Sequence, residues 1–357
     1  MLILIEINIY TYMIDDVLFR KFCRERNVKE STEHGYFSAL THYTKFQKAT
    51  LQELLDEAME DEEKGISLKD RRLKERLLKY RSFLFQTSGS PNTVKTYFTR
   101  VKSFYRHFEI KIPQLPDAKY ERLYETSYLD LPTKEHIRMA LELSGVDIRS
   151  IILFMSSSGT AKAETLSLTV EQFIDGCKDY HNGGNLREIL DTLSKKDNIV
   201  PTIYLRRIKT DKYYYTFCSP EASNEIIKYL QTRQGLKFND PLFDIPASTL
   251  LTRFQEINDT MGWGFKGKYR FFRSHALRKF HASNIGLTAE YVDALQGRAK
   301  NEVHETYIKT NPVELKKIYM SNMKRVMINP DDSDKTVHQE FNIIINVFLS
   351  GKEYNIY

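Results

Sequence analysis

Four residues in the last quarter of the chain have types and a spacing that could support chemistry. His275 and Arg278 lie three residues apart at the start of a helical apolar pattern, so both polar side chains can project from one helical turn. Arg298 precedes Tyr307 by nine residues, which fits an active-site cation across a helix-turn-helix from a hydroxyl group. Taken alone, His275 would be an ordinary surface histidine and Tyr307 a core tyrosine. The ordered spacing of the four residues is what indicates a site.

Short helices must position the last two of these residues. Thr288 is the predicted N-cap of a short helix, and Gly297 is its predicted left-handed C-terminal residue. A second short helix is expected to carry Val303, Tyr307 and Ile308.

This arrangement resembles the signature of the tyrosine recombinase (phage integrase) family. That signature is His-x-x-Arg, then Gly with a polar residue after it, then a tyrosine nine positions on. The matching positions are His275, Arg278, Gly297, Arg298 and Tyr307. The family usually has His or Trp where this chain has Arg298, and a basic residue there resembles archaeal integrases of mobile elements.

An upstream segment, residues 157–173, resembles the first conserved box of the family, with one departure. The matching residues are Gly159, Glu164, Leu166, Leu168 and Thr169. The catalytic arginine of the box is absent: Ala161 occupies its usual place, and Lys162 occupies the place it would have in a register shifted by one. The departure predicts a slow enzyme.

Residues 200–217 are predicted to form a β-hairpin with Thr210 and Asp211 at the turn. The segment resembles the family's β-hairpin, whose loop carries a lysine. Lys209 is the first candidate for that lysine and Lys212 the second. Without the flanking boxes, a lysine here would be expected merely to keep a sheet edge soluble.

The resemblance implies a reaction on DNA. Tyr307 would attack a phosphodiester to give a 3′-phosphotyrosyl link and a free 5′-hydroxyl, with no external energy source. Arg278, Arg298 and His275 would stabilise the charge that develops on the phosphate oxygens.

The remaining candidate residues have supporting roles in that reaction. Lys209 would protonate the leaving 5′ oxygen as general acid, and Glu164 would orient the cationic groups. Lys162 would supply positive charge in place of the missing arginine, without its fixed fork of donors. The resemblance implies no cofactor and no metal.

Before this region the pattern is helical, as in a small bundle. Candidate helices cover residues 15–26, 31–47, 50–63, 69–87 and 91–108. Lys95, Lys102 and Arg106 make a basic face on the last of these helices, opposite its apolar stripe. Such a face suits duplex phosphates, and the segment resembles a helix of the family's core-binding domain. A solvated charged face is the alternative.

A second cationic segment is predicted as a loop over residues 262–273. Its cations alternate with aromatic residues and suit contact with a sugar-phosphate backbone: Lys266, Lys268, Arg270 and Arg273. The aromatic residues could equally anchor the loop to the core.

The chain is long enough for two domains. The predicted organisation is a helical core-binding domain (1–112), a linker rich in irregular sequence (113–130), a catalytic domain (131–328) and an amphipathic tail (329–357). Further helices are expected over 150–157, 220–235, 248–261 and 312–327. The predicted fold class is mainly α with a small antiparallel β-sheet (α+β). The tail stripe, Val337 to Phe348, would pack on its own domain or on a neighbouring protomer.

Composition sets the broad class of the protein. A chain of 357 residues with a net charge of +6 and three scattered cysteines indicates neither a disulfide framework nor a zinc site. The apolar N-terminus lacks a basic region and is far too short to span a membrane, and Met13 is an alternative start. A cytoplasmic, DNA-associated protein is expected.

The leading prediction is a site-specific DNA recombinase that integrates or excises a mobile element. Its expected partners are double-stranded attachment-site DNA and further copies of itself in a tetrameric synapse, with no membrane. Two alternatives stay open, a type IB topoisomerase-like activity and a catalytically impaired member that binds DNA without cutting it.

Overall fold

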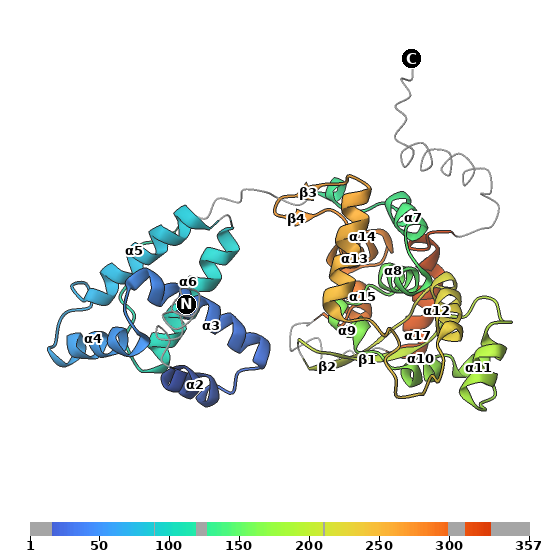
Figure 1. The fold of residues 1–357 in the computed structure, drawn as a ribbon, viewed down its shortest axis with the longest axis horizontal. Helices are drawn as coiled ribbons and strands as arrows, with labels where there is room; N and C mark the ends of the chain where they lie inside the picture. The colour runs from blue at the N-terminus through green and yellow to red at the C-terminus, as the bar shows by residue number, and fades with distance from the viewer. Residues whose placement is uncertain (1–15, 89, 119–126, 210, 299–310, 330–357) are drawn as a thin grey trace, which may run out of the picture. The chain divides into compact units, whose positions relative to one another are not determined.

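The computed structural model of the chain describes residues 16–88, 90–118, 127–209, 211–298 and 311–329. The chain divides into two compact units, Met1–Glu125 and Thr126–Tyr357 (Figure 1). The boundary falls inside the segment 113–130 that the sequence marks as a linker. The fold class predicted from the sequence is confirmed, since helices dominate and the described strands form two small antiparallel sheets.

The first unit is a bundle of helices. They are α2 (Asp16–Glu25), α3 (Glu30–Gln47), α4 (Leu51–Glu63), α5 (Arg72–Thr87) and α6 (Pro91–His107). These agree with the five predicted ranges except at the start of α5, which was expected at residue 69. The Ser67 hydroxyl donates a 2.6 Å hydrogen bond to Asp70, and Arg71 is extended, so this segment makes a turn before the helix begins.

The helices of the first unit pack through aromatic side chains. Tyr43, Tyr80 and Tyr105 are fully buried, and the Tyr43 and Tyr105 hydroxyls lie 3.1 Å apart. A buried hydroxyl needs a hydrogen-bond partner, so this pair fixes α3 against α6 at one register.

The second unit contains most of the helices. They are α7 (Lys134–Glu142), α8 (Val146–Ser158), α9 (Lys162–Leu166), α10 (Val170–Gly176), α11 (Leu186–Leu193), α12 (Pro220–Thr232), α13 (Ala247–Thr260), α14 (Ser274–Asn284), α15 (Ala289–Leu295) and α17 (Pro312–Asn322). Short 3-10 helices cover Tyr128–Asp130, Lys178–Tyr180 and Met323–Arg325. The predicted helix over 312–327 therefore ends at Asn322, and that over 220–235 ends at Thr232.

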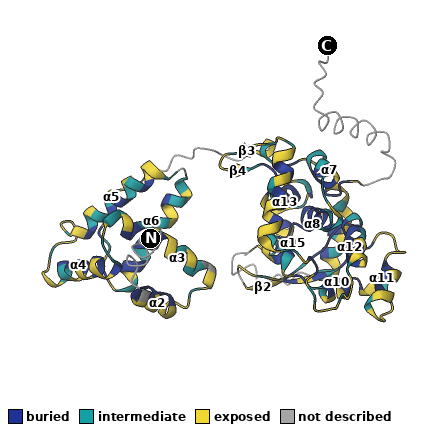
Figure 2. Ribbon diagram, viewed as in Figure 1, coloured by how far each residue is buried: buried dark blue, intermediate teal, exposed yellow. Residues whose placement is uncertain are grey.

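Helix α8 is the centre of the second unit and packs against α12 and α14. Its middle, residues 151–155, is continuously apolar, and ten of its 13 residues are buried. Figure 2 shows the helix largely in the colour of buried residues. A helix of this composition must be enclosed by others. It ends at Gly159, whose φ of +69° is left-handed.

The strands of the second unit form two hairpins. Strands β1 (Ile203–Arg207) and β2 (Lys212–Thr216) pair antiparallel, as predicted for residues 200–217, and the register places Arg207 opposite Lys212. The predicted loop over 262–273 is wrong in part. It contains a second, minimal hairpin of β3 (Phe265–Lys266) and β4 (Tyr269–Arg270).

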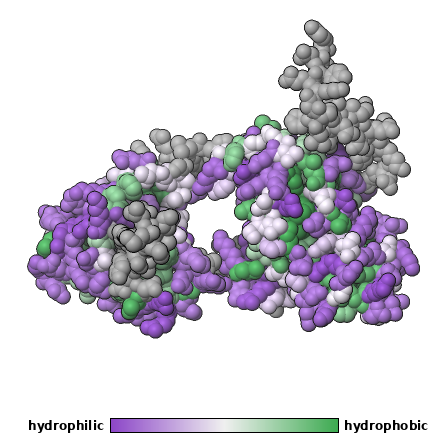
Figure 3. Space-filling view, in the orientation of Figure 1, coloured by the Kyte–Doolittle hydropathy of each residue, from purple (hydrophilic) through white to green (hydrophobic). Residues whose placement is uncertain are grey.

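Large apolar side chains lie mainly in the two cores, and hydrophilic residues dominate the visible surface of each unit (Figure 3). Within the described ranges, no helix has both the length and the apolar character to cross a membrane. The apolar N-terminus, the helix predicted around Tyr307 and the C-terminal stripe lie outside the described residues.

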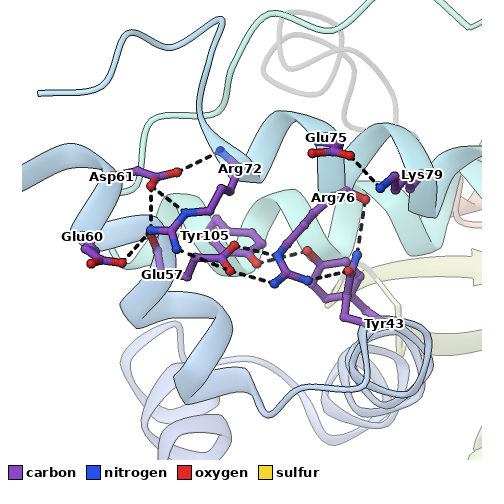
Figure 4. Close-up of polar contacts among 10 residues, drawn as sticks. Tyr43, Glu57, Glu60, Asp61, Arg72, Glu75, Arg76, Lys79 and Tyr105 are labelled. Carbon is purple, nitrogen blue, oxygen red and sulfur yellow. Dashed lines mark hydrogen bonds and ion pairs between the residues drawn. The ribbon is translucent and has the colours of Figure 1, made fainter. Parts of the chain in front are cut away.

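A polar network ties α4 to α5 in the first unit (Figure 4). Asp61 is fully buried and accepts two 2.8 Å hydrogen bonds from Arg72, one from the backbone N–H and one from Nε. Burial alone would raise the pKa of the Asp61 carboxyl, but these bonds outweigh it and lower the pKa. Arg76 forms a two-pronged pair with Glu57 at 2.6 and 2.7 Å.

We expect Asp61→Ala to destabilise the first unit by about 2–3 kcal/mol. A hydrogen bond to a charged group typically contributes about 1.5–3 kcal/mol, and the change leaves the donors of Arg72 without their buried acceptor. Chemical denaturation of the full chain tests this with two signals. Circular dichroism follows both units, whereas the only tryptophan of the chain, Trp263, belongs to the second. The variant should shift the circular dichroism transition and leave the tryptophan transition in place.

The control is Glu75→Gln, whose carboxylate pairs with Lys79 in an exposed ion pair on the same helix. It should barely move either transition. Since the folded pKa of Asp61 is depressed, its contribution is complete above the unfolded pKa and is lost as pH falls through the folded value. A difference between wild type and Asp61→Ala that persists undiminished at pH 2 would contradict this account.

Candidate active site

Arg278 is the buried centre of the candidate site. It lies on α14 with only 5% of its surface exposed. Its Nη1 donates a 2.8 Å hydrogen bond to the Gly159 carbonyl after α8, and its Nη2 donates one of 2.8 Å to the Gln296 carbonyl after α15. One guanidinium group therefore joins the ends of two helices.

The charge of Arg278 is poorly compensated. Burial, followed by the positive charge of Arg207, lowers the pKa of Arg278 to about 10, which leaves it protonated at neutral pH. Among the described residues, no carboxylate forms an ion pair with it. A buried cation held by neutral carbonyls is suited to an anionic ligand.

His275 precedes Arg278 by one helical turn, and only part of its side chain is open to solvent. Partial burial of the imidazole lowers its pKa, and the nearby charges of Lys279, Arg273, Arg278 and Arg298 lower it further. The imidazole is therefore mainly neutral at pH 7, so it can both donate and accept a hydrogen bond.

The turn after α15 brings Arg298 to the site. Gly297 has φ +58°, the left-handed conformation that the sequence predicts, and a Cβ at this position would lie 2.5 Å from Tyr214 Cδ1. Thr288 does occupy the N-cap position of α15, but its side chain makes no capping hydrogen bond. Arg298 is exposed, and its Nη1 lies 3.6 Å from Asp293. Tyr307 lies outside the described residues.

Ala161, Lys162 and Glu164, which the sequence matched to the first box, lie in or directly before α9. Ala161 is the extended N-cap residue, and Lys162 is the first residue of the helix, with a half-buried side chain. Glu164 is 3% exposed, and its Oε2 has no hydrogen-bond partner. Arg149, an arginine before this box, pairs instead with Glu225 at 2.6 Å.

Lys209 is exposed in the turn between β1 and β2, and Lys212 is the exposed first residue of β2. Arg206 and Asp211 form an ion pair across the same turn. The ion pair between Arg206 and Asp211 therefore holds the two ends of the turn that carries Lys209 close together.

Arg207 is a site residue that the sequence reasoning did not single out. It is the last residue of β1, and its Nη1 donates to the carbonyls of Gln296 at 2.9 Å and Gly297 at 2.8 Å. Arg207 and Arg278 therefore share the Gln296 carbonyl. The signal for Arg207 in the sequence was its place two residues before Lys209; its partner, 89 residues away, left none.

Gln296 and His281 are fully buried, and Gln296 contacts Arg278 directly. The Gln296 Nε2 donates to the Arg278 carbonyl at 3.1 Å and lies 2.9 Å from His281 Nδ1. The amide nitrogen of Gln296 can only donate, so Nδ1 accepts its second N–H and the imidazole proton lies on Nε2. Burial, Arg278 and Arg298 lower the pKa of His281 to about 3, so it stays neutral.

The cations of the second hairpin already contact a carboxylate or an aromatic ring of the protein. Lys266 lies 3.7 Å from Asp130, Lys268 lies 5.3 Å from the centre of the Tyr269 ring, and Arg270 makes a two-pronged pair with Asp259. Arg273 lies over the same Tyr269 ring at 4.8 Å. Lys266 and Arg270 thus already have acidic partners.

The basic face of α6 is different. Lys95 and Arg106 are exposed, and Lys102 is half-buried with its ammonium 4.9 Å from the Phe98 ring centre. Burial and the charges of Arg106 and Arg81 lower the pKa of Lys102. Within the described part of the chain, none of the three pairs with a carboxylate. Nor does that part hold a group of three His, Cys, Asp or Glu residues placed to bind a metal ion.

No protein-family model matches the chain, and no curated protein sequence matches it. Solved structures do. A lambda integrase tetramer bound to a Holliday junction has 13% identity and a TM-score of 0.52, over 81% of this chain and 74% of that chain.

Two other structures are less similar in fold. XerH site-specific recombinase bound to its difH substrate has 15% identity and a TM-score of 0.46, over 84% of this chain and 82% of that chain. The Tn1549 transposon integrase in complex with transposon right-end DNA has 14% identity and a TM-score of 0.43, over 85% and 97%. On the likeness to lambda integrase, the chain has the tyrosine recombinase fold.

Proposed function

We propose that the protein is a site-specific DNA recombinase that cuts and rejoins DNA through a 3′-phosphotyrosyl intermediate. The observation that carries the proposal is Arg278, a buried guanidinium group without a carboxylate partner, one helical turn from a neutral imidazole and on this fold. Of the nearby carboxylates that the structure describes, Glu164 is the one that raises the pKa of Arg278, and it forms no ion pair with the guanidinium, so a phosphodiester can supply the paired negative charge.

In the proposed reaction, Tyr307 oxygen forms a bond to phosphorus while the bond from phosphorus to the 5′ oxygen breaks. The tyrosine loses its proton to solvent or a nearby base, and the 5′ oxygen gains one from Lys209. Arg278, Arg298 and His275 stabilise the added charge on the phosphate oxygens. Rejoining reverses these steps with a 5′-hydroxyl as nucleophile.

Glu164 has a positioning role in this proposal. It is buried, and its negative charge favours the protonated state of Arg278. It therefore keeps the guanidinium charged in a site whose burial opposes charge. Lys162, half-buried at the start of α9, adds positive charge at the edge of the first box.

The proposed partner is double-stranded attachment-site DNA, with further copies of the chain in a tetrameric synapse. The structure of lambda integrase is of a tetramer bound to a Holliday junction, and the fold likeness extends over 81% of this chain. Integration or excision of a mobile element, as in archaeal integrases, is the process we propose, and the basic face of α6 would hold duplex phosphates.

A second candidate function follows from Ala161. A chain without the first-box arginine could bind attachment-site DNA without cutting it. A suicide substrate with a nick beside the cleavage site separates the two functions, since covalent trapping excludes the binder and its absence over long incubation excludes the recombinase.

We expect Tyr307→Phe to abolish covalent adducts while DNA affinity changes by no more than a few-fold, because the hydroxyl is the nucleophile and adds little to phosphate contacts. Denaturing electrophoresis of the trapped complex measures this. Tyr291→Phe, on exposed Tyr291 of α15, is the matched control and should form adducts normally. A denaturant-resistant adduct in Tyr307→Phe would assign the nucleophile elsewhere.

We expect the triple change of Lys95, Lys102 and Arg106 to Ala to weaken binding to all DNA sequences and to flatten its salt dependence. Each phosphate contact adds a slope of about 0.9 in log affinity against log salt. A control with the same charge loss elsewhere in the first unit changes Lys21, Lys64 and Lys79 to Ala. Equal salt slopes for the two triple variants would make the α6 face an ordinary solvated one.

A further inference from the structure

We propose that Arg207 contacts the scissile phosphate in place of the first-box arginine, whose usual position is occupied by Ala161. The inference rests on the proposed function and assigns to the β-hairpin a catalytic guanidinium group as well as a lysine.

The position of Arg207 favours a phosphate contact. Arg207 and Arg278 both donate to the Gln296 carbonyl, at 2.9 and 2.8 Å, so their guanidinium groups meet at one oxygen atom. Strand β1, which carries Arg207, also contacts α9, the helix of the first box. A guanidinium from β1 thus reaches the site beside the segment that should have supplied one.

The positive charges of Arg207 and Arg278 favour the same contact. Two like charges next to each other repel, and the repulsion is strongest where water is scarce. Arg278 is buried, and no carboxylate in the described part of the chain pairs with either arginine. Neutral carbonyls offset only part of this cost. The arrangement becomes favourable once an anion with several oxygens binds, as a phosphate does.

Arg207 also has unused hydrogen-bonding capacity. The buried Nε of Arg207 has no hydrogen-bond partner, and neither has the hydroxyl of Tyr214, which is near enough to Arg207 and Arg278 to be affected by their charges. Buried donors without partners are rare in folded proteins and mark places where a ligand completes the bonding. Lys162, the cation that the sequence offers within the first box, carries one ammonium group instead of a planar fork.

A purely structural role is the rival explanation, since Arg207 also ties the Gln296–Gly297 turn to β1. The two roles make different demands. A structural role needs hydrogen-bond donors at the end of β1. A phosphate contact needs a guanidinium group near the phosphate, and either β1 or the first box can carry that group. Moving the arginine from position 207 to position 161 therefore separates them.

The experiment measures adduct formation on a nicked suicide substrate by wild type, Arg207→Gln, and Arg207→Gln combined with Ala161→Arg. Loss of one oriented donor to a transition-state oxyanion costs about 100-fold to 1,000-fold in rate. We expect such a loss in Arg207→Gln with DNA affinity within a few-fold, and at least tenfold recovery in the double variant. Arg253→Gln, which removes an exposed arginine of α13 that pairs with Glu256, is the control and should react at the wild-type rate.

A second substrate guards against misfolding of Arg207→Gln. A methylphosphonate at the scissile position removes one negative charge from the phosphate, so it should shrink the wild-type to Arg207→Gln rate ratio at least tenfold. A structural tie predicts the same ratio on both substrates. An unchanged ratio, normal cleavage by Arg207→Gln, or no recovery in the double variant overturns the inference alone. Absence of adducts with wild type overturns the proposed function itself.

Discussion

The site depends on keeping the charged Arg278 guanidinium inside the second unit without a carboxylate partner. Its two carbonyl partners, at Gly159 and Gln296, belong to the ends of α8 and α15. Helix ends are the natural source of such acceptors, because their last carbonyls have no partner within the helix. The same bonds that satisfy the arginine thus fix where three helices, α8, α14 and α15, meet.

This arrangement explains why glycine is required at two turns. Gly159 and Gly297 both have positive φ. The Gly159 carbonyl accepts a hydrogen bond from Arg278, and the Gly297 carbonyl accepts one from Arg207. A Cβ at Gly159 would lie 2.5 Å from His281 Nδ1, and one at Gly297 would overlap the Tyr214 ring. The two glycines therefore allow close approach of the helix ends as well as the left-handed turns that close them.

The sequence predicted whatever is carried by local pattern. Helix periodicity placed His275 and Arg278 on α14, the turn residues placed the β1–β2 hairpin, and Gly297 marked the end of α15. Contacts between distant segments left no local signal, which is why Arg207 and its acceptor at Gln296 were not predicted. The second hairpin, with two residues in each strand, was too short for a β pattern to appear.

In the proposed recombinase, Ala161 at the usual place of an arginine bears on what such an active site requires. A transition state on phosphorus is stabilised by oriented positive charge near the non-bridging oxygens, and the electrostatic energy depends on the position of that charge, not on the segment that carries it. Strand β1 and the first box meet in this fold, so a guanidinium can reach the same region from either. Arg207 and Arg278 both donate to the Gln296 carbonyl, and this shared acceptor is what brings the guanidinium group of the strand to that of α14. On this argument the residue to examine in a recombinase fold that lacks a first-box arginine is the one that donates to the carbonyl after α15.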